Sequence, residues 1–217
     1  MNPSVAQIAA RPRLRGVIHH YAFFASLLTG GVLVALAPAG RRFWAAVVYA
    51  ISLSALLGVS ALYHRVTWSP ARRRWIGRLD HSMIHVLIAG TYTPFGMLAL
   101  SDTLAAFLLR VAWGGAAAGI TLHLLWYDAP KWLSASVYVA LGWVGLMATP
   151  SLIAQTGWTP VVLLLIGGLV YSVGAFVYAA RRPDPIPSVF GYHEVFHTLV
   201  VVAATAHYAA VAITVLS

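Results

Sequence analysis

Long apolar stretches alternate with short polar breaks along the chain. A helix crosses roughly 30 Å of hydrocarbon with about 20 mostly apolar residues, because each residue adds about 1.5 Å. Seven stretches approach or exceed this length, at 17–38, 43–64, 79–100, 103–126, 132–151, 159–180 and 193–216. The breaks carry arginines, together with proline, glycine and aspartate residues that are typical of turns. The pattern therefore predicts an all-α polytopic membrane protein, with a seven-helix transmembrane domain over 17–217 and a tail at 1–16.

Composition excludes several other classes of protein. Of the 217 residues, 60% are hydrophobic and only 9% are charged, whereas soluble domains carry about 25% charge. The chain contains no cysteine, which excludes disulfide scaffolds, thiolate metal sites and thiol nucleophiles. The only lysine, Lys131, falls in a predicted connection, so a retinal Schiff base inside the bundle is also excluded.

The basic residues are distributed unevenly between the two ends of the predicted bundle. One end holds Arg11, Arg13, Arg15, Arg65, Arg72, Arg73, Arg74, Arg78, Lys131, Arg181 and Arg182. The other end holds Arg41 and Arg42, and Arg110 lies within a span. The positive-inside rule then places the amino terminus in the cytoplasm and the carboxyl terminus outside. Anionic lipid headgroups attract such arginines, so the net charge of +9 requires no nucleic-acid partner.

The first span has some features of a cleaved signal peptide. A basic segment precedes it, and Ala35-Leu36-Ala37 resembles a cleavage site. Its apolar stretch is nevertheless longer than the 7–15 residues usual for a signal peptide. We therefore expect this span to be retained.

Several polar residues are predicted to lie at one depth. Ionisable groups inside a span cost about 2.5–3.5 kcal/mol each, so their placement is informative. Ser60 and His64 are four residues apart, as are His193 and His197, and this spacing puts each pair on one helix face. The predicted topology brings His64, Asp80, His193 and His197 to the cytoplasmic side of the bundle. These residues are therefore candidates for a shared site.

Three imidazoles and one water complete a tetrahedral zinc site with an open position. Zinc lowers the pKa of such a water to about 7. In this interpretation His64, His193 and His197 bind Zn²⁺, and Asp80 holds the water or takes its proton. Ser60 hydrogen-bonds the water or a polarised carbonyl. The predicted chemistry is hydrolysis of an acyl amide or ester.

Other polar residues leave alternatives open. His81 and His85 share a face of the third span, so they could replace or supplement the proposed ligands. Glu194 lies about 100° around the helix from His193 and is not expected to be a ligand. The remaining histidines are expected to be interfacial or packing residues: His19, His20, His123 and His207.

Four segments resemble a known family. They are Ser60-Ala61-Leu62-Tyr63-His64, Asp80-His81, Ala89-Gly90-Thr91-Tyr92-Thr93-Pro94-Phe95 and His193-Glu194-Val195-Phe196-His197. In order and spacing they are similar to the hemolysin III branch of the progestin and adipoQ receptor (PAQR) family. The resemblance implies seven helices, a cytoplasmic amino terminus and intramembrane zinc near the cytoplasmic face. It implies zinc ligands at His64, His193 and His197, a water-holding aspartate at Asp80 and a motif serine at Ser60.

The resemblance also implies a lipid-related function. Eukaryotic adiponectin-receptor members are linked to ceramidase-like lipid hydrolysis, and bacterial members to hemolysis and to membrane-lipid homeostasis. We therefore predict a zinc-binding protein of the bacterial inner membrane that hydrolyses a lipid amide or ester, with membrane lipid or fatty acid as its ligand. The alternatives are a non-enzymatic lipid or fluidity sensor with structural zinc, and a cytolytic pore.

Overall fold

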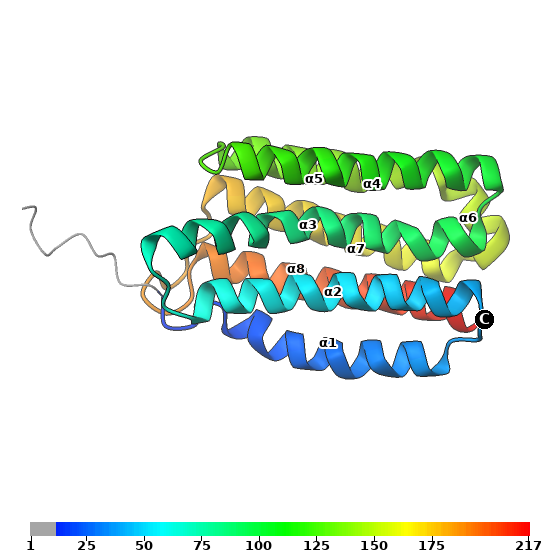
Figure 1. Ribbon diagram of the computed structural model, residues 1–217, viewed down its shortest axis with the longest axis horizontal. Helices are drawn as coiled ribbons and strands as arrows, with labels where there is room; N and C mark the ends of the chain where they lie inside the picture. Colours follow the sequence, from blue (N-terminus) through cyan, green and yellow to red (C-terminus); the bar gives the residue numbers. More distant parts are fainter. Residues whose placement is uncertain (1–11) are drawn as a thin grey trace, which may run out of the picture.

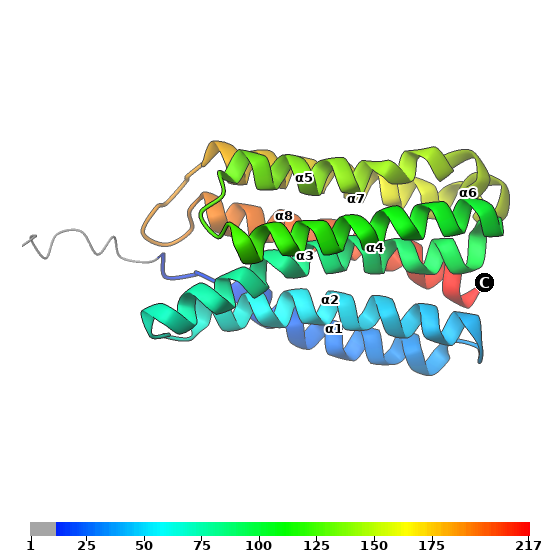
Figure 2. The same cartoon turned by 45° about the horizontal axis from the view of Figure 1, so that its top comes forward.

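The computed structural model of the protein describes residues 12–217, so Arg11 and the rest of the predicted tail before residue 12 lie outside the described residues. Seven helical segments of the described chain are long and apolar enough to cross a membrane, as predicted. They run up and down in one bundle (Figures 1 and 2). The segments are α1 (Val17–Leu36), α2 (Arg41–Arg65), α3 (Pro70–Ala99), α4 (Asp102–Leu125), α5 to α6 (Lys131–Thr156), α7 (Trp158–Ala180) and α8 (Tyr192–Leu216). The protein is therefore an integral membrane protein.

Helices α2, α3 and α8 pack against one another at the centre of the bundle. Leu53, Leu87 and Val211 belong to one buried core that these helices share. Gly90 lets α3 approach α2 closely, because a Cβ at this position would collide with the Ser52 hydroxyl. Small residues commonly permit such close approach between membrane helices. This packing holds the carboxyl end of α2 beside the amino end of α8.

The third helix begins at Pro70, whereas the hydropathy pattern predicted a span from residue 79. Proline is favoured in the first helical turn because its missing N–H is not needed there. Hydropathy indicates which residues lie within the hydrocarbon, whereas a helix can continue beyond it into polar surroundings. The helix therefore begins earlier than the predicted span. The predicted connection from Arg65 to Arg78 is accordingly wrong in part, since Arg72, Arg73, Arg74 and Arg78 lie on α3.

The fifth span is broken, although the sequence predicted one helix over 132–151. It consists of α5 (Lys131–Trp143), the 3₁₀ turn η2 (Val144–Ala148) and α6 (Thr149–Thr156). The hydroxyl group of Tyr92 on α3 lies 3.1 Å from the carbonyl oxygen of Leu141 and 2.8 Å from that of Gly142. It also accepts a 2.6 Å hydrogen bond from the N–H of Gly145. Because lipid offers no hydrogen bonds, backbone groups freed by such a break need partners within the protein.

Replacing Tyr92 with phenylalanine is expected to destabilise the bundle by about 1–2 kcal/mol, because it leaves polar backbone groups without a partner. Thermal unfolding of the detergent-solubilised protein measures this loss. Tyr21→Phe is the matched control, since Tyr21 is 70% exposed. Equal unfolding temperatures for the two variants would mean that Tyr92 does not support the broken span.

Candidate metal centre

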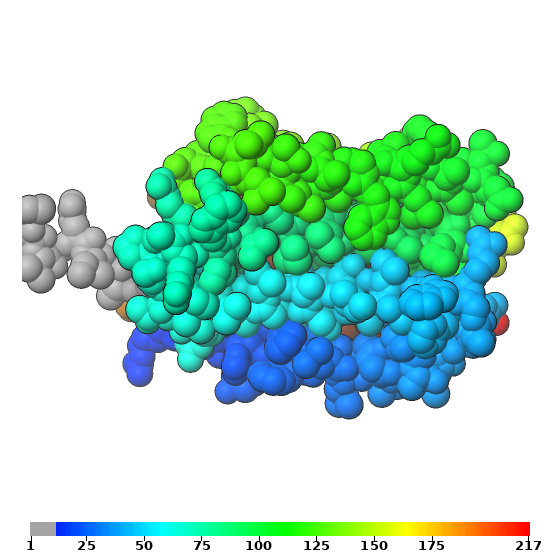
Figure 3. Space-filling view, viewed as in Figure 1, coloured from blue at the N-terminus to red at the C-terminus, as the bar shows by residue number. Residues whose placement is uncertain are grey.

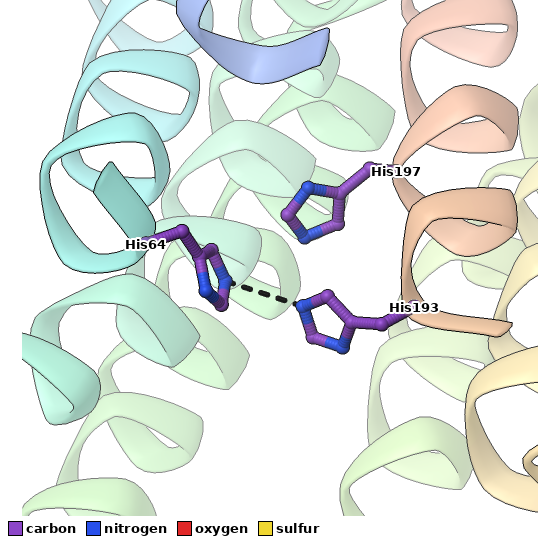
Figure 4. A group of neighbouring side chains, drawn as sticks. All are labelled: His64, His193 and His197. Atoms are coloured by element: carbon purple, nitrogen blue, oxygen red, sulfur yellow. Dashed lines mark hydrogen bonds between the residues drawn. The ribbon is translucent and has the colours of Figure 1, made fainter. Parts of the chain in front are cut away.

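Three histidines meet where the end of α2 approaches the start of α8. Figure 4 shows His64 projecting from α2 toward His193 and His197 on α8. The Nε2 atoms of His64 and His193 are 3.2 Å apart. One ligand nitrogen from each of the three rings lies within 4.8 Å of the others. In residues 12–217, no other three histidine, cysteine or acidic side chains come together in this way.

The donor set suits a metal ion. All three donors are imidazoles, which zinc and other transition metals accept. His64 and His197 are buried and His193 is half-buried, so water competes little for the site. Zinc–nitrogen bonds of 2.0–2.1 Å separate two ligands of a tetrahedron by about 3.3 Å, close to the spacing of His64 and His193. The widest separation is larger, so binding would draw the rings together. This group could hold a metal ion.

The first turn of α8 is fixed by polar contacts. The N–H of Gly191 donates to Glu194 Oε2 at 2.9 Å, and the N–H of Tyr192 donates to Asp184 Oδ1 at 2.8 Å. The other oxygen of Glu194 accepts a hydrogen bond from Arg15 Nε at 2.5 Å. Both carboxylate oxygens of Glu194 therefore have partners, and Glu194 does not belong to the three-histidine group.

The described part of the predicted tail packs beside the site. The backbone N–H groups of Arg13 and Leu14 donate to the carbonyls of Ser188 and Val189, at 3.0 and 3.1 Å. Gly16, which precedes α1, has a φ of 75°. A Cβ added at Gly16 would lie 2.5 Å from His64 Cβ. The position of His64 thus depends on a glycine at residue 16.

Replacing Gly16 with alanine is expected to destabilise the protein by about 2–4 kcal/mol and to weaken metal binding. Left-handed backbone costs about 1–2 kcal/mol for other residues, and overpacking adds about 1–3 kcal/mol. Gly40→Ala is the control for metal binding, because Gly40 also has a positive φ, of 91°, but nothing lies within 4 Å of its added Cβ. Thermal unfolding and metal analysis compare the two. If the Gly16 variant kept as much metal as the Gly40 variant, the contact with His64 would not support the metal centre.

Asp80 and Ser60 lie next to the histidine group. Asp80 Oδ2 is 3.8 Å from Nε2 of His64. Ser60 Oγ is 2.8 Å from Nδ1 of His19. Both side chains line the same cavity as His193 and His197. The structure therefore brings all five predicted site residues to one place, while the chemical roles of Asp80 and Ser60 stay predictions.

His19 has a closer relation to the site than the sequence indicated. It was expected only as an interfacial or packing residue. Its ring stacks on that of His197, with centroids 3.8 Å apart and planes 3° from parallel. Together with its bond to Ser60, this contact ties α1 to both α2 and α8. His19 is thus a positioning residue for two members of the site.

The alternative ligands His81 and His85 do not join the three-histidine group. They lie near His123 on α4, with ring centroids 5.3 and 5.5 Å from it. Nε2 of His123 is 2.8 Å from the hydroxyl oxygen of Tyr138. These residues pack α3 against α4 and α5.

A cavity of about 220 Å³ begins at the metal centre. Its polar lining is formed by His19, Ser60, Asp80, His81, His193 and His197, among others. From Asp80 the lining follows α3 through Phe95 to Leu100, the residue after the helix, a rise of about 30 Å at about 1.5 Å per residue. Leu152 on α6 and Val161 on α7 line it near the other end of the bundle. The cavity therefore joins a polar site to a long apolar interior.

Seven apolar helices around a buried three-histidine group define a polytopic membrane protein with a candidate metal centre inside the bundle. The family model described as "Haemolysin-III related" matches residues 8–208. The chain therefore belongs to the haemolysin-III-related family, within the hemolysin III branch of the PAQR proteins that its motifs predicted.

Relatives of this chain occur in bacteria, animals and plants. The "Hemolysin-3 homolog" of Bacillus subtilis (strain 168) is 34% identical over 153 residues, which cover 70% of this chain and 68% of the relative. The human "Monocyte to macrophage differentiation factor" is 26% identical over 168 residues, or 76% and 67% of the two chains. The rice "Heptahelical transmembrane protein ADIPOR2" is 28% identical over 184 residues, or 77% and 80%. No solved structure gives a significant match.

Proposed function

We propose that this protein is a zinc-dependent hydrolase of a lipid amide or ester that acts in membrane-lipid homeostasis. The observation that carries the proposal is the three-histidine group, of which His193 and His197 line the polar end of a long apolar cavity. A cavity of this shape suits an acyl chain, whose polar linkage would then lie beside His193 and His197. Membrane lipids and fatty acids are the ligands with this chemistry.

His64, His193 and His197 would hold the zinc ion. When bound, zinc supplies a Lewis acid that polarises a carbonyl and lowers the pKa of a coordinated water. Three protein ligands leave a fourth position open, as in catalytic zinc sites. His19 would hold the ring plane of His197 through their stacking contact. The chemistry of the donor set thus supports a catalytic ion.

Asp80 and Ser60 would act on the substrate and its water. The Asp80 carboxylate, beside His64 in the cavity wall, would accept a proton from water and return it to the leaving amine or alcohol. The Ser60 hydroxyl, bonded to His19 at 2.8 Å, would donate a hydrogen bond to the substrate carbonyl. Apolar residues along the rest of the cavity would exclude water from the acyl chain.

The proposal includes an orientation. The positive-inside rule would put the histidine end of the bundle at the cytoplasmic face, because the described basic residues at the end of α2, at the start of α3, in the α7–α8 connection and before α1 lie at that end. The carboxyl terminus, marked in Figure 1 at the opposite end, would lie outside. With a Bacillus relative, the bacterial inner membrane is the proposed location.

Fatty-acid release tests the hydrolase directly. The purified protein is reconstituted in vesicles that contain ceramide or phospholipid, and free fatty acid is measured by mass spectrometry. Release should cease after removal of metal by a chelator and return when zinc is restored. Absence of release from every lipid by the zinc-loaded protein would reject the hydrolase.

A non-enzymatic sensor is the second candidate function. An ion held by His64 and His193 would join α2 to α8, and such a clamp could respond to lipid without turnover. A Ser60→Ala, Asp80→Ala variant that keeps its zinc separates the two functions. A sensor would retain its effect on membrane fluidity, whereas a hydrolase would lose it. Dye release from vesicles tests the cytolytic alternative that the name of the Bacillus relative suggests.

A further inference from the structure

Two arginines near the start of α3 rest on aromatic rings. Cζ of Arg73 is 5.0 Å from the centroid of Tyr63. Cζ of Arg78 is 4.7 Å from the centroid of Trp75 and 5.9 Å from that of Tyr127. Cation–π contacts of this kind hold the guanidinium groups in place. The hydroxyls of Tyr63 and Tyr127 are 3.5 Å apart, so the two arginines lie around one tyrosine pair.

These guanidinium groups have unmet hydrogen-bonding capacity. Nη1 of Arg73 and Nε of Arg78 are buried, and neither has a hydrogen-bond partner. Among residues 12–217, the two ion pairs on α3 join His64 to Asp80 at 3.8 Å and Arg74 to Asp128 at 3.7 Å, and neither involves Arg73 or Arg78. A buried charged donor without an acceptor costs free energy. An anion that accepted hydrogen bonds from these guanidinium groups would remove this cost.

The surroundings indicate which anion fits. Trp75 is 59% exposed, and exposed tryptophans are enriched where lipid headgroups meet the hydrocarbon. Figure 3 shows the start of α3 accessible on this face of the molecule. A guanidinium group can bind a phosphate through two parallel N–H···O hydrogen bonds. The exposed indole of Trp75 offers an apolar surface to the acyl chains of a lipid. A free phosphate ion would leave that surface in water.

We propose that Arg73 and Arg78, supported by Tyr63, Trp75 and Tyr127, form a binding site for the phosphate of an anionic phospholipid. The site lies at the same end of the bundle as the metal centre, because Tyr63 directly precedes His64 in α2. It uses no residue of the histidine group. The assignment goes beyond the proposed hydrolase and does not depend on it.

Lipid binding by the full-length protein tests this site. Native mass spectrometry measures the affinity for phosphatidylglycerol, with phosphatidylcholine as the zwitterionic comparison. An Arg73→Gln, Arg78→Gln variant should bind phosphatidylglycerol about tenfold more weakly, because about 1.4 kcal/mol of charged hydrogen bonding is lost. Arg72→Gln, Arg182→Gln is the control, with the same change of charge at two exposed residues, and should bind within about twofold of wild type.

A lysine variant and a competition experiment with inorganic phosphate complete the test. An Arg73→Lys, Arg78→Lys variant keeps the charge but loses the planar fork, so weaker binding of phosphatidylglycerol than in wild type is expected even if the glutamine variant does not fold. Inorganic phosphate at equal concentration should not displace the lipid. Equal phosphatidylglycerol affinity in the wild type and both arginine-pair variants would overturn the site, and displacement by inorganic phosphate would overturn the lipid assignment. Zinc content, measured in parallel, reports separately on the metal centre.

Discussion

Replacing His197 with alanine is expected to remove the bound metal and all activity that depends on it. His197 is buried and is one of the three histidines that could hold a metal ion. Even the loss of a group that merely supports a ligand lowers metal affinity by about 10–100-fold, so loss of a ligand itself should exceed about 100-fold. Metal analysis of the purified protein after dialysis measures the effect. One metal ion per chain in wild type should fall to almost none.

His20→Ala is the control for this variant. His20 is exposed on α1, one residue after His19, and makes no contact with the histidine group. It should keep the metal content of wild type, whereas His197→Ala should not. Equal metal content in the two variants would show that His197 is not a ligand.

Asp80→Asn is expected to lower lipid hydrolysis by about 10²–10⁴-fold, the usual contribution of a general acid or base. The substitution keeps the shape of the side chain but removes its ability to take a proton. Because Asp80 is 3.8 Å from His64 and does not belong to the ligand group, the variant should retain its metal. Fatty-acid release and metal content are measured on the same preparation.

Asp102→Asn provides the matched control, since Asp102 begins α4 and is exposed. It should hydrolyse lipid at the wild-type rate. Full turnover by Asp80→Asn would remove Asp80 from the chemistry. Loss of metal from the same variant would instead make Asp80 part of the ion's coordination.

Much of the fold could be predicted because each membrane span needs about 20 consecutive, mostly apolar residues, and such stretches are easily recognised in a sequence. The missed features follow from forces that hydropathy does not measure. Pro70 begins α3 well before the apolar stretch, because helix formation continues into polar surroundings. The break after Trp143 is stabilised by Tyr92 of another helix, and a contact between distant segments cannot be inferred from either segment alone.

The histidine group could be predicted because its members share two simple signals. His193 and His197 are one helical turn apart, and His64 ends a span on the same side of the predicted bundle. His19 lies near the start of the first span, so the same depth argument could have included it. However, no second histidine lies four residues from His19 in the sequence. Only the packing of α1 against α8 reveals the stacking of His19 on His197.

X-ray absorption at the zinc edge tests the metal centre most directly. The wild-type protein, purified in detergent with zinc supplied, should contain one zinc ion per chain. Its spectrum should show three imidazole nitrogens at about 2.0–2.1 Å and one oxygen ligand at about 2.0–2.2 Å. A protein that binds no zinc, or a spectrum with fewer than three imidazoles around the ion, would contradict a centre formed by His64, His193 and His197.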